Sequence, residues 1–184
     1  MYYGMYREGK AGTMQYFTVV PSPVGVLTLA CDESGTNLTG LWIEGQKHHG
    51  GAASEDEERG DMPVFFAAKN WLDRYFAGEK PCISELPLSP MGSGFRQGVW
   101  RALCEIPYGG LATYGEIAKK MAAKTSARAV GGAVAHNPIS IIIPCHRVVG
   151  SNGSLTGYAA GLDKKTWLLE LEGADCDHGK GALR

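Results

Sequence analysis

The sequence predicts a mixed α/β fold of the α+β kind in two parts, an antiparallel sheet with one helix followed by a mainly helical part. Three short β-rich runs lie within residues 16–43, with turn residues between them. After residue 94, apolar residues recur at helical spacing. Residues 86–94 are rich in Pro, Ser and Gly, so we place a domain boundary there and divide the chain into residues 1–90 and 91–184.

The N-terminal part begins with a predicted antiparallel meander. Its strands cover residues 16–20, 26–30 and 38–43, and short turn-forming segments join them. Residues 44–61 are rich in Gly, His and acidic side chains and show no apolar period. This composition predicts a surface loop.

A helix is predicted directly after this loop. Asp61 and Pro63 are typical of a helix start, and Gly78 ends the pattern. The apolar residues between them recur at helical spacing, which gives the helix one face that can cover the meander. These residues are Val64, Ala68, Trp71, Leu72 and Tyr75.

Two short helices in succession predict a helix-turn-helix in the C-terminal part. Thr113 and Glu116 match a capping box, in which the hydroxyl accepts from a backbone N–H and the carboxylate reaches back to the cap. The helix that follows runs through about Ala122. Ser126 is a second N-cap, and the Gly- and Ala-rich residues 127–135 follow it.

The remaining segments frame this motif. Apolar spacing predicts a helix over residues 95–106. Pro138 ends the second helix of the motif, and residues 139–143 form an apolar run that we expect to be extended and buried. A last amphipathic helix is predicted over residues 164–172, ended by Gly173.

Charge is distributed unevenly along the chain. The total of 18 basic and 19 acidic side chains, a net charge of −1, gives no sign of a nucleic-acid partner. Residues 1–90, however, carry 7 basic and 12 acidic side chains, whereas residues 91–184 carry 11 and 7. The segment 91–165 alone carries 9 basic and 3 acidic side chains. A near-neutral total therefore hides a basic C-terminal part.

Cysteine usage and hydropathy indicate the compartment. Five cysteines at wide spacing form neither a CxxC pair nor a dense framework, which favours a reduced, intracellular protein. No segment approaches the roughly 20 consecutive apolar residues of a membrane span, and the first residues lack the apolar centre of a signal peptide. We expect a cytoplasmic protein, or a nuclear one in a eukaryote.

The most informative pair is Cys145 beside His146, which follows Pro144 and the apolar run. A thiol is a strong nucleophile only as the thiolate, and a nearby imidazole favours that form. On an extended backbone, adjacent side chains point to opposite faces, so contact between these two needs a sharp turn or a bridging water. Taken alone, the pair is better explained as a buried structural cysteine next to an unrelated histidine.

The surrounding residues reverse that judgement. Asn137-Pro138, five residues, then Pro144-Cys145-His146-Arg147-Val148 closely resembles the signature of the O6-alkylguanine-DNA alkyltransferases. Further elements of that family follow in its order: Pro107-Tyr108-Gly109 with Thr113-Tyr114, Ala127-Arg128-Ala129-Val130-Gly131, Gly157-Tyr158, Gly161-Leu162 and Lys164 through Leu168-Leu169 to Glu172. The resemblance is specific over residues 91–173 and looser over residues 15–85.

The resemblance implies a fold and an activity. The N-terminal part would be a ribonuclease-H-like domain, and the C-terminal part would bind DNA and accept the alkyl group. Cys145 would attack the alkyl carbon on guanine O6 by direct displacement. The product would be a thioether, which water cannot hydrolyse as it does an activated acyl or phosphoryl group. Each molecule would therefore react once.

The resemblance also assigns roles near the cysteine. Glu172 would orient His146, which would draw the proton from Cys145 through a water, as in a nucleophile-base-orienter triad. Tyr114 would donate to a guanine ring nitrogen, and Asn137 would fix the turn around the cysteine. The backbone carbonyls of Cys145 and Val148 would accept from the guanine amine. The pocket would be lined by Pro144, Val148, Tyr158 and Ala159.

A DNA partner follows from the same resemblance. Chemistry on a stacked base requires flipping it out of the duplex, and Arg128 would take its place in the stack. The helix-turn-helix would lie in the minor groove, a mode suited to finding lesions in any sequence. Contacts to DNA would come from Thr113, Lys124, Ser126, Ala127 and Ala129 besides Arg128, and Lys119 and Lys120 would add phosphate contacts against Glu116 alone.

Two departures from the family pattern stand out. Many relatives of the family carry a serine, arginine, glycine or tryptophan where this chain has Ala159-Ala160, so the width of the pocket stays open, although the Ala159 N–H can still reach guanine O6. Cys31, Cys82, His48 and His49 show no recognised zinc spacing. We therefore expect no metal and no cofactor. We also expect the protein to be a monomer. We expect the tail at residues 176–178 to be disordered rather than metal-binding.

Two other functions stay open on the sequence alone. A cysteine hydrolase would use Cys145 and His146 on an acyl substrate, but it needs an oxyanion hole that no residue pattern marks. A DNA-binding module would leave Cys145 incidental. Single residues also admit plainer roles: Glu172 as a solvated helix end, Tyr114 as packing and Asn137 as a turn residue. Their joint order within one pattern favours the functional roles.

Overall fold

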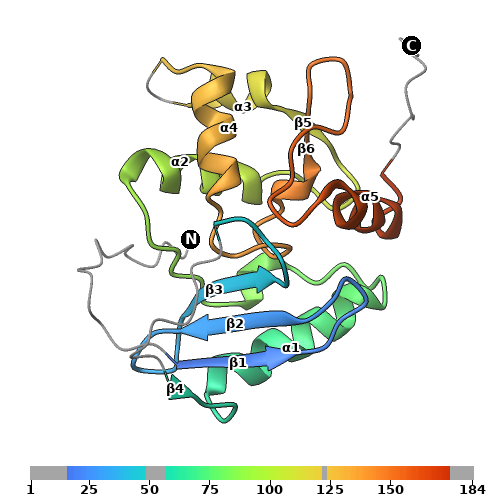
Figure 1. Cartoon of the computed structure of the whole chain (residues 1–184). Coiled ribbons are helices and arrows are strands. Elements are labelled where there is room, and N and C mark those ends of the chain that lie inside the picture. Colours follow the sequence, from blue (N-terminus) through green and yellow to red (C-terminus); the bar gives the residue numbers. More distant parts are fainter. Residues whose placement is uncertain (1–15, 49–56, 122–123, 175–184) are drawn as a thin grey trace.

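The computed structural model describes residues 16–48, 57–121 and 124–174, and it has the predicted α+β architecture (Figure 1). A sheet with one helix forms the N-terminal part, and helices dominate the C-terminal part. In chain order the elements are β1 (Tyr16–Val20), β2 (Leu27–Cys31), β3 (Leu38–Ile43), β4 (Glu57–Glu58), α1 (Pro63–Phe76), η1 (Ile83–Glu85), α2 (Gly94–Cys104), β5 (Ala112–Thr113), α3 (Tyr114–Lys120), α4 (Ala127–Ala135), η2 (Cys145–Arg147), β6 (Val148–Val149) and α5 (Leu162–Leu171).

The meander is confirmed, with one strand that the sequence did not indicate. β1 pairs with β2 and β2 with β3, both antiparallel, so the sheet order is β3-β2-β1-β4. β4 pairs parallel with β1, with Tyr16 opposite Glu57. It lies inside the stretch 44–61 that we expected to be loop throughout. Two glutamates have no strand propensity, and only the neighbouring β1 makes them extended.

β3 lies between the two parts of the chain (Figure 1). One edge pairs with β2. Along the other, Leu38 N–H donates to Pro87 O and Leu41 N–H to Pro138 O, and Leu41 O accepts from Ser140 N–H, all at 2.8 Å. Because it is paired on both edges and covered on both faces, all six of its residues are buried. The sheet therefore hydrogen-bonds directly to the segment that leads to Cys145.

α1 covers one face of the sheet, as its apolar spacing predicts. Pro63 occupies the first turn, where its missing N–H costs nothing. Asp61 does not cap the helix: the N-cap position is Met62, and the Asp61 carboxylate pairs with Arg59 at 2.9 Å. The buried face carries the five predicted residues and Phe65.

The helix-turn-helix is formed by α3 and α4, which pack against each other and against α2. Both predicted caps are present: Thr113 Oγ1 accepts from Glu116 N at 3.2 Å, and Ser126 Oγ accepts from Ala129 N at 3.2 Å. α3 ends at Lys120, before the expected Ala122, which lies outside the described residues.

The apolar run 139–143 is buried, but the expectation that it is extended is wrong. Ile142 N–H donates to Ser140 O at 2.8 Å across Ile141, whose φ is +69°. A three-residue turn of this hand is rare and strained, and strain is greatest for a β-branched residue. The run therefore turns back on itself rather than crossing the core. A short apolar run has the same sequence pattern in a buried turn as in a buried strand, so periodicity could not distinguish the two.

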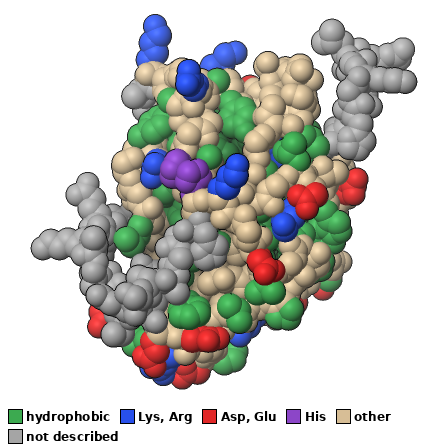
Figure 2. Space-filling model, in the orientation of Figure 1, with side chains coloured by type: hydrophobic (Ala, Val, Ile, Leu, Met, Phe, Trp, Pro, Cys, Tyr) green, Lys and Arg blue, Asp and Glu red, His purple; other side chains and the backbone are tan. Residues whose placement is uncertain are grey.

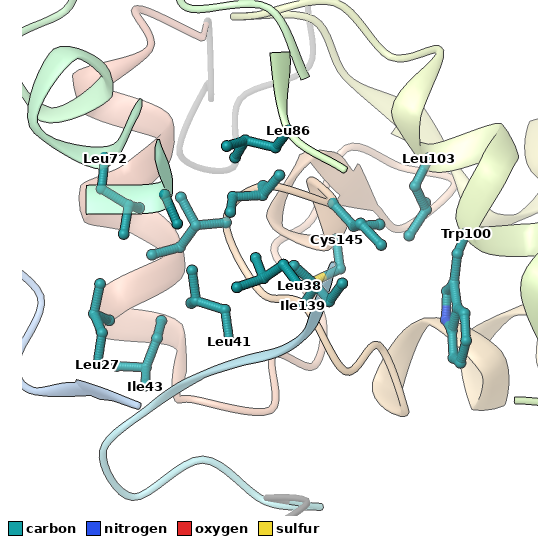
Figure 3. Close-up of a cluster of buried hydrophobic side chains, with 14 of the residues drawn as sticks. Leu27, Leu38, Leu41, Ile43, Leu72, Leu86, Trp100, Leu103, Ile139 and Cys145 are labelled. Atoms are coloured by element: carbon teal, nitrogen blue, oxygen red, sulfur yellow. The ribbon is translucent and has the colours of Figure 1, made fainter. Parts of the chain in front are cut away.

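One apolar core joins both parts of the chain. Leu38 and Leu41 of the sheet pack near Ile139, and Cys145 lies beside them, as Figure 3 shows. Trp100 Nε1 donates to Ala133 O at 2.9 Å and fixes α2 against α4. No helix within the described ranges is long and apolar enough to cross a membrane.

We predict that Leu41→Ala lowers the free energy of unfolding by about 3 kcal/mol, because it opens a cavity where the sheet meets the segment before Cys145. Val19 lies on the same sheet but is 49% exposed, so Val19→Ala should cost less than about 0.5 kcal/mol. Urea unfolding of both variants measures the difference. Equal losses would contradict this account of the core.

Candidate active site

Cys145 sits at the start of a one-turn helix that follows a tight turn. Pro144 has φ −82° and ψ 65°, and Cys145 N–H donates to Ile143 O at 2.8 Å across it. These values define an inverse γ-turn, for which the fixed φ of proline is suited. Residues 145–147 then form η2. The backbone at Cys145 and His146 is therefore helical and not extended, so their side chains need not point to opposite faces.

Asn137 ties this turn together. Its side-chain Nδ2 donates to Ile143 O at 2.8 Å and to Ile139 O at 3.3 Å, while its Oδ1 accepts from Ile139 N at 3.0 Å. The side chain is 3% exposed. Three hydrogen bonds from one buried amide agree with its predicted role in fixing the turn around the cysteine.

The thiol of Cys145 is almost enclosed. The residue is 6% exposed, and burial raises the pKa of the thiol above its usual value. Asn137, the Lys165 ammonium and the Tyr158 hydroxyl act in the opposite direction on the same pKa. The resting group is therefore the neutral thiol, in surroundings that favour the thiolate once a base removes the proton.

His146 is completely buried and bonded to Glu172. Nε2 lies 2.8 Å from Glu172 Oε1, while the buried Nδ1 has no hydrogen-bond partner among the described residues. Next to a carboxylate, Nε2 carries the proton, which leaves Nδ1 as an acceptor. Burial lowers the pKa of His146, so the imidazole is neutral at pH 7 and able to take a proton.

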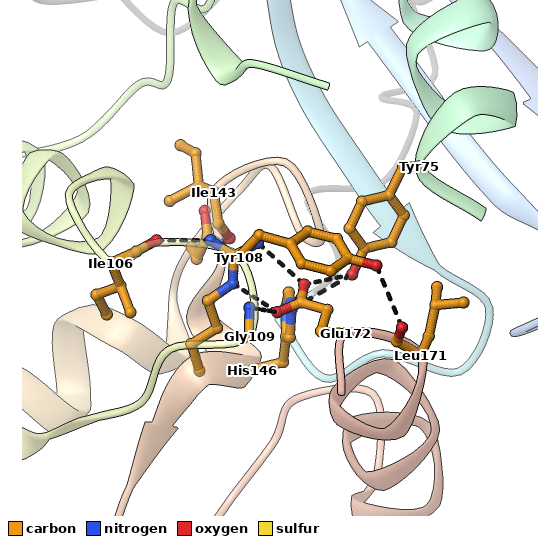
Figure 4. A network of polar contacts seen from close by, with 10 residues as sticks. Tyr75, Ile106, Tyr108, Gly109, Ile143, His146, Leu171 and Glu172 are labelled. Carbon is orange, nitrogen blue, oxygen red and sulfur yellow. Dashed lines mark hydrogen bonds and ion pairs between the residues drawn. The ribbon is translucent and has the colours of Figure 1, made fainter. Parts of the chain in front are cut away.

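Glu172 is the centre of a buried polar network (Figure 4). Arg147 donates through Nε to Oε2 at 2.8 Å and through Nη2 to Oε1 at 2.9 Å. The Tyr75 hydroxyl donates to Oε1 at 2.6 Å, and Gly109 N–H donates to Oε2 at 3.1 Å. Burial by itself would raise the pKa of Glu172, but the hydrogen bonds from His146, Arg147 and Tyr75 lower it well below its usual range. Glu172 is therefore a fixed anion and not a solvated helix end.

Two side chains of this network were not predicted as site residues. Tyr75 was assigned to the core face of α1, and only the tertiary structure shows its hydroxyl on the carboxylate. Arg147 was noted only as part of the motif. It is 5% exposed, and its Nη1 donates to Ile106 O at 2.6 Å. A buried arginine needs an anion, so the apolar residues around it were the available signal.

Lys165 is a third unpredicted residue. It is fully buried on α5, and its ammonium donates to the backbone carbonyls of Val148 and Thr156. The Val148 carbonyl, expected to face the guanine amine, therefore already accepts one hydrogen bond. A carbonyl has two lone pairs, so it can accept a second.

The pocket residues lie on two sides of the thiol. Pro144 and Val148 flank Cys145 on the chain and are buried. Tyr158 and Cys145 each affect the pKa of the other, although the buried Tyr158 hydroxyl makes no hydrogen bond to a described residue. Ala159 is half-buried, and its carbonyl accepts from Lys47 N at 2.8 Å.

The predicted DNA contacts gather on the helix-turn-helix. In the first turn of α4, Arg128 and its neighbours Ala127 and Ala129 are exposed. Ser126 and Lys124, which precede the helix, are also exposed. On α3, the half-buried ring of Tyr114 faces Gly131 of α4, where a Cβ would lie 3.7 Å from the ring. The Thr113 hydroxyl is engaged in its capping box.

The basic character of this surface is real but less complete than expected. Lys119, Lys120 and Lys124 are exposed with Arg128. Lys120 Nζ, however, lies 3.5 Å from Glu105, so Glu116 is not the only nearby acid. Figure 2 shows basic side chains on the upper, C-terminal part and acidic ones gathered at the foot of the sheet.

A groove of about 910 Å³ lies elsewhere, between the linker 80–88 and the segment 101–108. Tyr75, Tyr108 and Arg147 line it, but Cys145 does not. It therefore lies against the Glu172 network and is not a pocket for the reacting group. No cluster of three or more potential metal ligands occurs among the residues that the structure describes.

We predict that Tyr75→Phe lowers the free energy of unfolding by about 2 kcal/mol, because it removes a hydrogen bond to a buried charge. Tyr108→Phe is the matched control, since that hydroxyl donates to the neutral Leu171 O at 3.2 Å and should cost about 1 kcal/mol or less. Thermal or urea unfolding compares the two. A larger loss for Tyr108→Phe would contradict the central position of Glu172.

Comparison with known proteins identifies the family. The model of the 6-O-methylguanine DNA methyltransferase DNA-binding domain matches residues 94–174, and that of its ribonuclease-like domain matches residues 14–90. The methylated-DNA–protein-cysteine methyltransferase of Haemophilus influenzae is 45% identical over 160 residues, which are 87% of each chain. That of Methanosarcina acetivorans is 47% identical, over 86% of this chain and 99% of the relative.

Solved structures agree. Mycobacterium tuberculosis OGT in complex with DNA superposes with a TM-score of 0.76 at 44% identity, covering 85% of this chain and 92% of that one. The O6-methylguanine-DNA methyltransferase of Pyrococcus kodakaraensis gives 0.62 at 27% identity, covering 88% and 100%. The two-part fold, with a ribonuclease-like part before a DNA-binding part, is thus confirmed. The chain belongs to the O6-methylguanine-DNA methyltransferase family.

Proposed function

We propose that this protein repairs O6-alkylguanine in DNA by transferring the alkyl group to its own Cys145. The observation that carries the proposal is the arrangement of a buried thiol, one residue before a neutral, buried His146 that is held by the anionic Glu172. The names of its relatives describe the same reaction. The protein acts once, since no group in the product thioether is activated toward water.

The reaction is a displacement at carbon. A bond forms between Cys145 Sγ and the alkyl carbon, and the bond from that carbon to guanine O6 breaks with its electron pair going to the guanine. The thiol proton passes through a water to Nδ1 of His146, which has no partner of its own among the described residues. Glu172 stabilises the imidazolium that forms.

The electrostatics keep the resting site neutral. Burial raises the pKa of Cys145 and lowers that of His146, so proton transfer between them is unfavourable until a substrate is present. Lys165 then stabilises the thiolate through its buried positive charge. This arrangement limits reaction with other electrophiles while the pocket is empty.

The leaving guanine needs hydrogen-bond donors at its ring nitrogen and O6, and hydrogen-bond acceptors at its exocyclic amine. Tyr114 donates to a guanine ring nitrogen as negative charge develops, and the Ala159 N–H donates to O6. The carbonyls of Cys145 and Val148 accept from the exocyclic amine. Support comes from Val148 O, which Lys165 fixes in place while leaving one lone pair free.

Double-stranded DNA is the partner. The helix-turn-helix binds in the minor groove, the base flips into the pocket, and Arg128 fills the gap in the stack. Thr113, Lys124, Ser126, Ala127 and Ala129 contact the backbone. The exposed first turn of α4 supports this, because its two alanines allow a close approach. Residues 1–90 and 91–184 act as the two domains of an intracellular monomer.

We predict that incubation with an oligonucleotide containing O6-methylguanine adds one methyl group to the peptide that contains Cys145. Mass spectrometry measures the mass shift and its stoichiometry. Cys145→Ala should retain DNA affinity and lose transfer completely. Turnover of more than one substrate per protein, or hydrolysis of esters, would instead favour a cysteine hydrolase.

We predict that Arg128→Ala slows transfer from duplex DNA by about 100-fold, since holding a base out of the stack costs a few kcal/mol. Transfer from the free O6-methylguanine base should be unchanged, because no flipping is needed. Lys124→Ala is the matched control. It should weaken binding to all DNA sequences and lower the slope of log K against log salt concentration by about 1, which corresponds to the release of about one counterion fewer. Equal slowing on duplex and free base would contradict the role of Arg128.

A further inference from the structure

The turn after β3 touches the C-terminal part at three places, through three successive residues. We call residues 46–48 the clasp. Gln46 Oε1 accepts from Ser140 Oγ at 2.9 Å, and Lys47 N–H donates to Ala159 O at 2.8 Å. The His48 ring stacks on the His136 ring, with 4.2 Å between centroids. In Figure 1 this turn rises from the sheet toward the lower end of α4.

Each partner of the clasp belongs to a different element of the site. Ser140 lies in the segment that leads to Cys145. Ala159 belongs to the pocket, and His136 is the C-cap of α4, where its Nδ1 lies 2.7 Å from Gly132 O. A single turn of the N-terminal domain thus contacts the segment that leads to Cys145, the predicted pocket and the end of α4.

Gln46 is buried between the two domains and accepts a hydrogen bond from each of them. The residue is 6% exposed, and the same Oε1 that accepts from Ser140 also accepts from Ile43 N at 3.2 Å. Ser140 is itself buried, and its N–H donates to Leu41 O. A buried hydroxyl that loses its acceptor is costly, so this pair fixes Ser140 relative to the sheet.

The segment held in this way is strained. Ile141 follows Ser140 with φ +69°, a conformation that persists only where surrounding contacts over-determine it. Asn137 holds the far side of the turn through Ile143 O, and Gln46 holds the near side through Ser140. Relaxation of Ile141 would move Ile143 and the γ-turn that presents Cys145.

We propose that Gln46 is a positioning residue for alkyl transfer, which acts through Ser140 to keep Cys145 in its reactive place. Lys47 and His48 hold the pocket and α4 in register with it. The N-terminal domain therefore contributes directly to the transfer step, although none of the clasp residues touches the reacting atoms. This inference rests on the proposed function.

Ser140→Ala is the sharpest test, because it deletes the hydrogen bond from the Ser140 hydroxyl to Gln46 and leaves Gln46 bonded to Ile43 N. At saturating DNA we expect transfer to slow by about fivefold, since small misplacements of a nucleophile are costly. DNA affinity should not change, and transfer from the free O6-methylguanine base should slow by the same factor. Gln46→Leu should slow transfer by about tenfold, because it removes the acceptor of both the Ser140 hydroxyl and the Ile43 N–H.

Thr18→Ala is the matched control, as Thr18 is equally buried on β1 but two strands away from the clasp. The double variant of Gln46→Leu and Ser140→Ala should be no slower than Gln46→Leu alone. If Ser140→Ala transfers at the rate of Thr18→Ala, the proposal is overturned, whether or not Gln46→Leu folds. No transfer by the unaltered protein would instead overturn the proposed function.

Discussion

The buried carboxylate of Glu172 is the interaction on which the site depends. It accepts hydrogen bonds from Tyr75 on α1, from Gly109 in the loop before β5, and from His146 and Arg147 on η2. Its own position, at the end of α5, is one where the helix dipole disfavours an anion. An isolated carboxylate could not be buried there, so the four segments must meet for any of them to be stable.

Such a network gains more in specificity than in stability. Burying Arg147 and Glu172 together costs desolvation that their attraction only offsets, whereas leaving either one alone is strongly unfavourable. The arrangement therefore selects a single docking of α1, η2 and α5. His146 receives its orientation from this docking, and the same contacts that hold the domains together fix which ring nitrogen faces away from the carboxylate.

Much of the fold and the centre of the site could be predicted from the sequence. Apolar periods gave the three antiparallel strands and the helices, and the caps at Thr113 and Ser126 located α3 and α4 to within a few residues. The burial of residues 139–143 was also predicted. Their conformation was not, because the positive φ of Ile141 is held by hydrogen bonds that Asn137 and Leu41 make to the run and is contrary to the local preference of isoleucine.

The missed residues share one physical property. Tyr75, Arg147, Lys165 and Gln46 each carry a polar group whose partner is distant in sequence, and in each case the local pattern had a sufficient plainer explanation. The strand β4 was missed for the same reason, since Glu57 and Glu58 are extended only by pairing with β1. Spacing and composition do not identify the partner in such a long-range pair, although the apolar residues around Arg147 indicate that it needs one.

The pairing of β3 on both edges has a consequence for self-association. Unpaired strand edges are templates for joining sheets of different molecules. Here the edge nearest the site is occupied by the protein's own segments, and the opposite edge ends in a two-residue strand made only of glutamates. Like charges would face each other if two such edges met, and so short a strand offers few hydrogen bonds. At Tyr16 and Phe17, β4 thus makes the edge of the sheet unfavourable for pairing with another molecule.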